Sequence, residues 1–335
     1  MRNRMLTLAV AAVAAGIGLV TVPPSNAATI TTASSPSTAQ ARPSAAPPVT
    51  SRIAVHFDLA KGQLPENIAL GPDGTAYVTF ATARQVAAIS PAGATRILAT
   101  LPAPADGGAD TPVLGFALTT GIVRTADGTL YFLYASGDAA TTGLYRLRPG
   151  QEPRRIAAPP ATGLPNGLAY DEPAKTFYLT DSVHGTITTV PLNGGHAQVW
   201  SSARELSATS FLGANGIKVR HGAVWATNLD RGTLLRIPIN RGRHGAVRVK
   251  AAGLAGIDDL AFAGTGDDQV IATLNAPNKV VRIDADGRAK TLLTTAAGLQ
   301  NPTSVAVRGR TVYVLSAAYI TATDPNLVLA TLPRR

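Results

Sequence analysis

The chain has 335 residues, no cysteine and a formal net charge of +10 at pH 7. Because cysteine is absent, disulfides and a cysteine-linked lipid anchor are excluded, and stability must come from core packing, a metal ion or closure of the fold. The basic residues are scattered and no aromatic residues interleave them, which argues against a nucleic-acid partner.

The N-terminal segment is typical of a secretory signal. Arg2 and Arg4 give a positive start, an apolar run extends from Leu6 to Val22, and Ser25-Asn26-Ala27 offers small residues for cleavage. No stop-transfer charges follow the run. We therefore expect a signal peptide over residues 1–27, a secreted protein and no stable membrane insertion after cleavage. Loss of the two arginines would lower the net charge from +10 to +8.

A spacer separates this segment from the folded part of the chain. Residues 28–50 consist almost entirely of Thr, Ser, Ala and Pro, with a single Arg42. Such a composition cannot bury enough apolar surface to offset its ordering entropy, so it predicts disorder. The remaining residues, 51–335, are sufficient for one large all-β domain or two ordinary domains.

Short strand patterns then recur at even intervals, bounded by Gly, Pro, Asp and Asn. Six similar strand openings fall at residues 66, 120, 166, 215, 258 and 303, and successive openings are 43 to 54 residues apart. Spacings of this size with four strands per repeat are typical of propeller blades. We predict an all-β, six-bladed β-propeller with four-stranded antiparallel blades, and the residue count disfavours seven.

The first and last repeats indicate how the ring closes. The first has an inner strand from Ile68 to Leu70, a tight turn at Gly71-Pro72-Asp73-Gly74 and a second strand from Thr75 to Phe80. The sixth is one strand short, and the alternating segment from Arg52 to Leu59 can complete it. We expect this N-terminal strand to close the last blade, which would hide both edges and favour a monomer.

Four of the six openings carry a metal-ligand type of residue at one register. In a propeller the inner strands begin near the central channel on one face, so these side chains should converge. Two carboxylates and two amide carbonyls are hard oxygen donors, suited to Ca²⁺ or a similar divalent cation. Asn-Gly pairs are also ordinary turn signals, which is the alternative explanation for two of the positions. The predicted ligands are Glu66, Asn166, Asn215 and Asp258, and the other two openings are Thr120 and Thr303.

The loops between second and third strands should form a rim around this cluster. Within them, Asp181 and Asn228 are candidate substrate contacts, and His184 is either a proton carrier or an ordinary polar loop residue. The sequence contains no Gly-x-Ser-x-Gly elbow, no zinc pattern of histidines and no phosphate-binding glycine loop. The sequence therefore gives no support for a serine hydrolase or a zinc enzyme.

The openings Pro65-Glu66, Pro165-Asn166-Gly167, Ala214-Asn215-Gly216-Ile217 and Ile257-Asp258-Asp259 resemble those of the senescence marker protein/gluconolactonase/paraoxonase superfamily. The resemblance extends over the domain after the spacer. It implies a six-bladed propeller with a divalent cation, usually calcium, in the central channel, and most members are lactonases or esterases. It also implies that Glu66, Asn166, Asn215 and Asp258 are the cation ligands.

The chain departs from the paraoxonase pattern. Asp259 matches the neighbour that also touches the ion in paraoxonase-like members, but there is no cysteine pair and no evident histidine dyad. Asn67 and Gly167 stand where a second, structural calcium would require carboxylates. The resemblance therefore favours a simpler, gluconolactonase-like site with one cation.

The first functional hypothesis is a secreted, calcium-dependent hydrolase of small lactones or related esters. The cation would stabilise charge on the carbonyl oxygen, and Asp258 or Asp259 would take a proton from the attacking water, with His184 as a further catalytic candidate. Alternation along the inner strand points the two aspartates to different sides, which favours Asp258 as ligand and base. One alternative is a non-catalytic extracellular binding module with a structural cation. Another is a lyase or condensing enzyme on the same scaffold.

Overall fold

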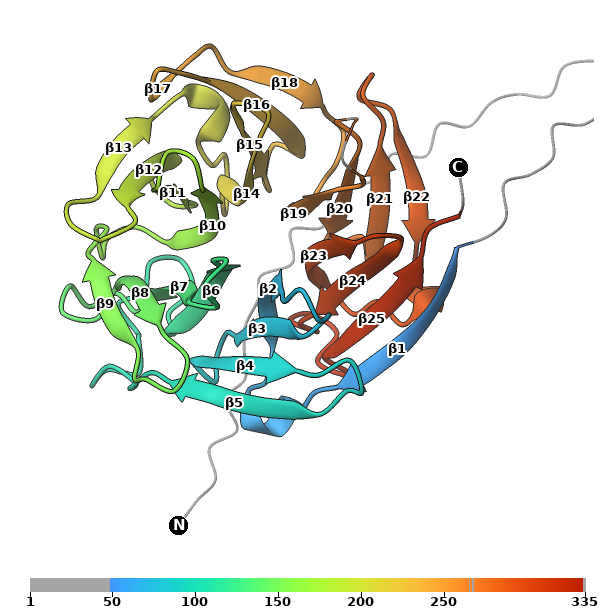
Figure 1. Ribbon diagram of the computed structural model, residues 1–335, viewed down its shortest axis with the longest axis horizontal. Coiled ribbons are helices and arrows are strands. Elements are labelled where there is room, and N and C mark those ends of the chain that lie inside the picture. Colours follow the sequence, from blue (N-terminus) through green and yellow to red (C-terminus); the bar gives the residue numbers. More distant parts are fainter. Residues whose placement is uncertain (1–48, 265, 267, 334–335) are drawn as a thin grey trace, which may run out of the picture. The chain divides into compact units, whose positions relative to one another are not determined.

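The computed structural model describes residues 49–264, 266 and 268–333. These residues form six antiparallel β-sheets arranged as blades around a common axis (Figure 1). The predicted signal peptide, residues 1–27, lies outside the described residues, as does all of the predicted spacer up to residue 48. None of the described helices combines the length and the apolar character that a membrane crossing would need.

The first three blades have four strands each, numbered from the axis outward. Blade 1 comprises β2 (Pro65–Leu70), β3 (Ala76–Phe80), β4 (Gln85–Ile89) and β5 (Thr95–Thr100). Blade 2 comprises β6 (Leu118–Arg124), β7 (Leu130–Ala135), β8 (Gly143–Leu147) and β9 (Arg154–Ala157). Blade 3 comprises β10 (Pro165–Asp171), β11 (Thr176–Asp181), β12 (Thr186–Pro191) and β13 (Gln198–Ser201).

The other three blades repeat this order, with an extra short strand in blade 4. Blade 4 comprises β14 (Ala214–Arg220), β15 (Ala223–Asn228), β16 (Thr233–Asn240) and β18 (Arg248–Ala251), and β17 (Arg243–His244) also pairs with β16. Blade 5 comprises β19 (Ile257–Phe262), β20 (Val270–Leu274), β21 (Lys279–Ile283) and β22 (Ala289–Leu293). Blade 6 comprises β23 (Pro302–Arg308), β24 (Thr311–Ser316), β25 (Asn326–Thr331) and β1 (Thr50–His56).

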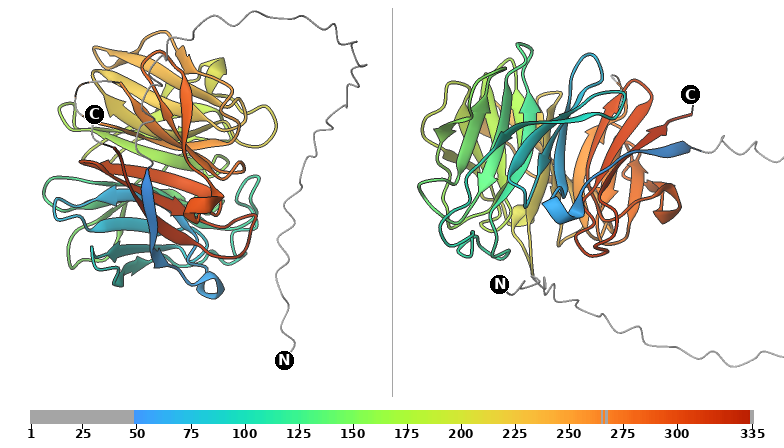
Figure 2. Two further views of the ribbon diagram at one scale, coloured as in Figure 1. Left: turned by 90° about the vertical axis from the view of Figure 1, so that its right-hand side faces the viewer. Right: turned by 90° about the horizontal axis from the view of Figure 1, so that it is seen from below.

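Three 3₁₀ turns complete the described secondary structure: η1 (Leu59–Lys61), η2 (Arg204–Leu206) and η3 (Thr295–Ala297). The predicted closure of the ring is confirmed, because β1 pairs antiparallel with β25 as the outer strand of blade 6 (Figure 2). Each inner strand also contacts the inner strands of both neighbouring blades. The six-bladed, all-β prediction is therefore confirmed.

Alternation along the strands builds the core between the blades. In β7, for example, Leu130, Phe132 and Tyr134 pack toward blade 1, whereas Tyr131 and Leu133 pack toward blade 3. Successive side chains of a strand point to opposite faces of its sheet, so a blade that is covered on both sides is apolar at nearly every position. Six apolar clusters lie between neighbouring blades in this way.

Candidate metal centre

Each inner strand has a register shift at its opening, and this shift positions the predicted ligands. In blade 1, Pro65 pairs with Phe80 and Asn67 with Thr79, so Glu66 has no partner across the sheet. The other five inner strands have a register shift at the same place. A bulge locally bends the strand and re-aims a side chain. Repeated six times, it leaves the opening residue of every blade without a partner across the sheet, alone in blades 1 and 6 and with the following residue in the other four.

A buried hydroxyl joins each blade to the next around the ring. In four blades the donor is a threonine of the second strand, and its acceptor is the backbone carbonyl of the next opening. These bonds are Thr79 to Thr120 (2.7 Å), Thr180 to Asn215 (2.5 Å), Thr227 to Asp258 (2.6 Å) and Thr273 to Thr303 (3.3 Å).

Blades 2 and 6 make the same connection differently. Leu133 and Leu315 occupy the second-strand position there, and neither can donate. The opening residue donates instead: Thr120 Oγ1 to the Pro165 carbonyl (2.9 Å) and Thr303 Oγ1 to the Pro65 carbonyl (2.8 Å). These two threonines therefore hold blades together, which explains why only four openings carry ligand-type residues.

Close packing between the openings explains the Asn-Gly pairs, which lie within strands and not in turns. A Cβ atom on Gly167 would lie 2.2 Å from the Asn215 carbonyl oxygen, and one on Gly216 would lie 2.6 Å from the Asp258 carbonyl oxygen. Real Cβ atoms do not approach an oxygen this closely. Glycine is thus required at these positions by the neighbouring blade.

Supporting side chains from the rim loops hold three of the predicted ligands. The Tyr319 hydroxyl donates to Glu66 Oε2 at 2.6 Å, and Asn166 Nδ2 donates to Ser182 Oγ at 3.1 Å. Within the described part of the chain, no hydrogen bond reaches Glu66 Oε1 or Asn166 Oδ1. Each side chain is therefore fixed through one atom and offers an oxygen through the other, as metal ligands commonly do.

Asp258 is held by an amide from a rim loop. Asn275 Nδ2 donates to its Oδ2 at 3.1 Å, and both Asn275 and the Asn215 side chain lower the pKa of this carboxyl group. Asn215 and Asp258 belong to neighbouring blades, and their joint binding of an ion stays a prediction. Asn275 lies in the predicted rim loop of blade 5.

Electrostatics show that the two carboxylates of the cluster lie close together. Burial raises the pKa of Glu66 to about 7, since the Tyr319 hydrogen bond that lowers it is outweighed by desolvation and by the Asp259 charge. Burial and the charges of Glu66 and Asp259 raise the pKa of Asp258 well above its usual value. Blades 1 and 5 are not neighbours, so these side chains interact across the centre of the ring.

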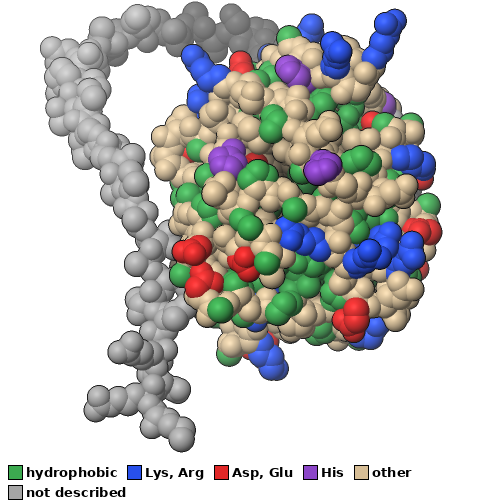
Figure 3. All heavy atoms as spheres, turned by 90° about the vertical axis from the view of Figure 1, so that its left-hand side faces the viewer, with side chains coloured by type: hydrophobic (Ala, Val, Ile, Leu, Met, Phe, Trp, Pro, Cys, Tyr) green, Lys and Arg blue, Asp and Glu red, His purple; other side chains and the backbone are tan. Residues whose placement is uncertain are grey.

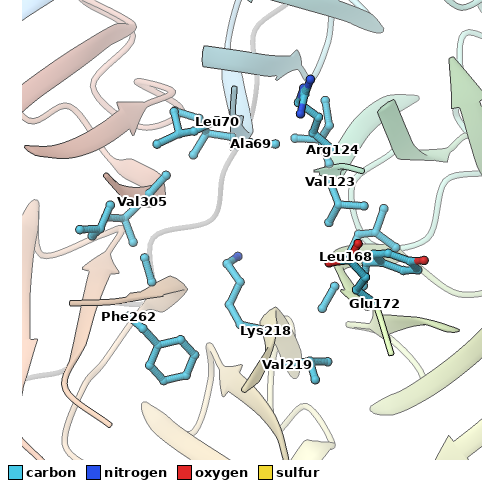
Figure 4. Close-up of a pocket in the computed structure, with 17 residues that line it drawn as sticks. Ala69, Leu70, Val123, Arg124, Leu168, Glu172, Lys218, Val219, Phe262 and Val305 are labelled. Atoms are coloured by element: carbon cyan, nitrogen blue, oxygen red, sulfur yellow. The ribbon is translucent and has the colours of Figure 1, made fainter. Parts of the chain in front are cut away.

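Asp259 differs from Asp258 because both of its oxygens are paired. Lys218 Nζ donates to Oδ1 at 2.9 Å, and Ser304 Oγ donates to Oδ2 at 2.5 Å. The Lys218 amine projects into a cavity of about 460 Å³ at the opposite end of the channel (Figure 4). Apolar residues from the far ends of the inner strands, such as Val305, form most of its wall.

The two predicted substrate contacts shape rim loops. Asp181 Oδ1 accepts backbone N–H groups from Leu164, Val183 and His184. The Asn228 amide donates to the Glu205 and Ser207 carbonyls and accepts from the Arg231 N–H, and the residue has no exposed surface. A substrate contact by either residue stays a prediction, whereas their loop contacts are evident.

His184 is oriented by Asp181. Its Nδ1 lies 2.9 Å from Asp181 Oδ2, and its Nε2 lies 3.5 Å from Thr162 Oγ1. A carboxylate on one ring nitrogen fixes the orientation of an imidazole and leaves the other nitrogen for a second partner. This Asp–His pair was not predicted as a unit, although both residues were candidates. Their spacing of three residues within one loop is the signal that could have revealed it.

The donor set fits a hard divalent cation. The charges of Glu66 and Asp259 raise the pKa of Asp258, the charge of Asp259 raises that of Glu66, and the amine of Lys218 is bound to Asp259, so a cation would relieve uncompensated negative charge. The described residues contain no group of three or more His, Asp and Glu side chains placed to hold a metal. The candidate set instead mixes Glu66 and Asp258 with the amides of Asn166 and Asn215.

The fold and this oxygen cluster place the chain among six-bladed β-propellers with a polar centre at one end of the channel. No family model matches the chain, and no curated protein does. Solved structures share the fold at low sequence identity. The arrangement is that of gluconolactonase- and regucalcin-like proteins, so the resemblance expected from the strand openings is confirmed for the fold.

Three similar structures illustrate this. A calcium-binding regucalcin from Agrobacterium tumefaciens is 14% identical over 85% of this chain and 94% of its own, with a TM-score of 0.62. A gluconolactonase from Xanthomonas campestris is 14% identical over 87% and 99%, with a TM-score of 0.60. A catalytically inactive histidine-to-alanine virginiamycin B lyase from Staphylococcus aureus, with quinupristin, is 17% identical over 81% and 82%, with a TM-score of 0.58.

Proposed function

We propose that the protein is a divalent-cation-dependent hydrolase of lactones or related esters, with calcium as the preferred ion. The observation that carries the proposal is the pair of buried carboxylates, Glu66 and Asp258, which occupy the same strand-opening position as the amides of Asn166 and Asn215 and interact through their charges. The gluconolactonase-like and regucalcin-like neighbours support the same chemistry at the level of the fold.

Glu66, Asn166, Asn215 and Asp258 would hold the cation, which when bound supplies a Lewis acid for the substrate carbonyl. Around it, the chain provides fixed supports. Tyr319, Ser182 and Asn275 each hold one ligand side chain, so little reorganisation is needed when a ligand arrives. Rigid positioning of this kind favours catalysis, since the polar groups already point where charge develops.

Three residues were candidates to move the proton of the attacking water. Asp259 is the poorest fit, because Lys218 and Ser304 occupy both of its oxygens. Asp258 and His184 fit better. Asp258 lies in the cluster itself, and His184 is oriented by Asp181 with its Nε2 directed to Thr162. We assign the base to one of these two residues.

The test is a panel of lactones and aryl esters assayed with calcium, with magnesium and with chelator. We expect turnover with calcium and at least a hundredfold loss with chelator or in the Glu66→Gln variant. His184→Ala separates the two candidate bases, because only a base at His184 would make kcat fall while calcium affinity is unchanged. Turnover that survives both chelation and Glu66→Gln would rule out the cation mechanism.

A lyase is the second candidate, and the oriented His184 favours it together with the likeness to virginiamycin B lyase. An elimination needs a base beside a carbonyl activated by a cation, and both would be present here. Product analysis by mass spectrometry distinguishes the reactions, since hydrolysis adds one water to the substrate and elimination adds none. If neither product forms and chelation lowers only the melting temperature, a binding module with a structural cation is the better description.

Export is part of the proposal. The pattern of residues 1–27 supports a secreted protein. Expression of the full chain, fractionation of cells and medium, and N-terminal sequencing would test it. Mature protein in the medium that begins at residue 28 is expected, and full-length protein retained in the cell would contradict it.

A further inference from the structure

A seventh apolar cluster lies apart from the six between the blades. Its members come from the segments that lead into the openings of blades 2, 3 and 4 and from the rim loops of several blades. The partly exposed members are Leu114, Phe116, Val183, Leu229 and Tyr319. Since the Tyr319 hydroxyl is bound to Glu66, this cluster extends to the edge of the carboxylate site.

Exposed apolar residues continue the cluster outward. Val113, Phe211 and Ile320 are 56%, 45% and 57% exposed, and each is adjacent in sequence to a member of the cluster. The other large exposed apolar side chains of the described chain lie on outer strands. Apolar side chains that gather on one exposed face commonly mark a binding site.

One of the exposed residues beside the cluster has a strained backbone. Val113 has a φ of 68°, which a β-branched residue rarely adopts. Asn or Gly would fit that conformation at lower cost, yet the chain places an exposed apolar side chain there. Strained residues of this kind concentrate at functional sites. Val113 therefore holds an exposed apolar side chain beside the cluster in spite of its backbone conformation.

The outer side of the propeller shown in Figure 3 carries a mixed surface. Basic, acidic and apolar side chains are interspersed there, and neither sign of charge forms a continuous block.

We propose that the substrate carries an apolar arm, an alkyl or aryl substituent on the lactone or ester, which lies against this cluster while its carbonyl group faces the carboxylate site. This inference rests on the proposed function. Leu114, Phe116, Val183 and Leu229 offer no hydrogen bonds, so a polyhydroxylated lactone would lose its bonds to water against them without replacement. An apolar arm instead gains affinity as it leaves water.

The test compares γ-lactones with side chains from methyl to hexyl against glucono-δ-lactone, using the full chain with calcium. We expect kcat/KM to rise by about fourfold for each added methylene until the cluster is covered. Glucono-δ-lactone should be the poorest substrate of the set. This increase in kcat/KM with alkyl length should be observed whether Asp258 or His184 acts as the base.

Two variants locate the selectivity. Val113→Asn relieves the strained φ, so it should fold at least as well as the wild type and yet reduce the gain per methylene to about twofold or less. Phe116→Ser should do the same, with circular dichroism to verify its fold. Val199→Asn is the matched control, because Val199 is exposed on the outer strand β13, and its gain should remain about fourfold.

Failure of this inference can be told from failure of the proposed function. Turnover that is independent of chain length, or fastest with glucono-δ-lactone, would overturn the apolar arm and leave the hydrolase intact. If no compound is turned over, calorimetry with δ-decalactone decides. Binding that weakens in Val113→Asn and not in Val199→Asn would support the apolar site alone, and no binding would overturn both.

Discussion

Replacing Glu66 with glutamine should make the cation-free protein more stable at pH 8 and less responsive to calcium. Glu66 is buried, and its neighbours are other carboxylates, so its ionised form is unfavourable in the folded protein. Glutamine keeps an oxygen that can accept the Tyr319 hydrogen bond and removes the charge. The same change deletes one predicted cation ligand, so the effect on stability should reverse when calcium is added.

The magnitude follows from the pKa of Glu66. Because burial raises this pKa from 4.5 to about 7, the folded state holds a proton that the unfolded state releases, and stability falls as the pH rises through this interval. Each pKa unit corresponds to about 1.4 kcal/mol, so at pH 8 the ionised carboxylate costs the cation-free protein about 3 kcal/mol. At pH 4.5 most of this cost is absent, and the two proteins should differ little.

Thermal unfolding at pH 4.5 and pH 8, with chelator and with calcium, measures these effects. With chelator at pH 8, Glu66→Gln should melt about 6 °C above the wild type. Addition of millimolar calcium should raise the melting temperature of the wild type more than that of Glu66→Gln. Glu152→Gln, at an exposed loop position, is the control and should show neither effect. Equal melting temperatures at both pH values would show that Glu66 is not an uncompensated buried charge.

Three further changes test other contacts by unfolding or calorimetry. Thr227→Val should lower the free energy of unfolding by about 2–4 kcal/mol, because a buried carbonyl and a buried N–H lose their partner. Its control is Thr189→Val, which should be nearly neutral because the hydroxyl bond of Thr189 is exposed. Tyr319→Phe should weaken calcium binding about 10- to 100-fold, since the ligand carboxylate loses its support. Lys218→Met should cost about 3–5 kcal/mol by leaving a buried carboxylate without its cation, and the exposed Lys61→Met should leave stability nearly unchanged.

The strand pattern was sufficient to predict the fold because its signals are local. Residues alternate with a period of two along each strand, and turn residues divide the strands, so each blade can be identified from about 50 consecutive residues. Closure by the N-terminal strand followed from the missing strand of blade 6. The extra strand β17 was not predicted, because a pair of two residues has no measurable period.

At the site, the sequence determined the residue types and their register, because the repeat places one opening residue of each blade at the same position. It did not determine which atoms support them. Tyr319 and Glu66 are 253 positions apart, and Ser304 reaches Asp259 across a blade boundary. Closure of the ring brings the first pair together and packing of neighbouring blades the second, and no local pattern records a contact between distant segments. Strand alternation was sufficient to favour Asp258 over Asp259, but only the tertiary structure showed that Lys218 pairs with Asp259.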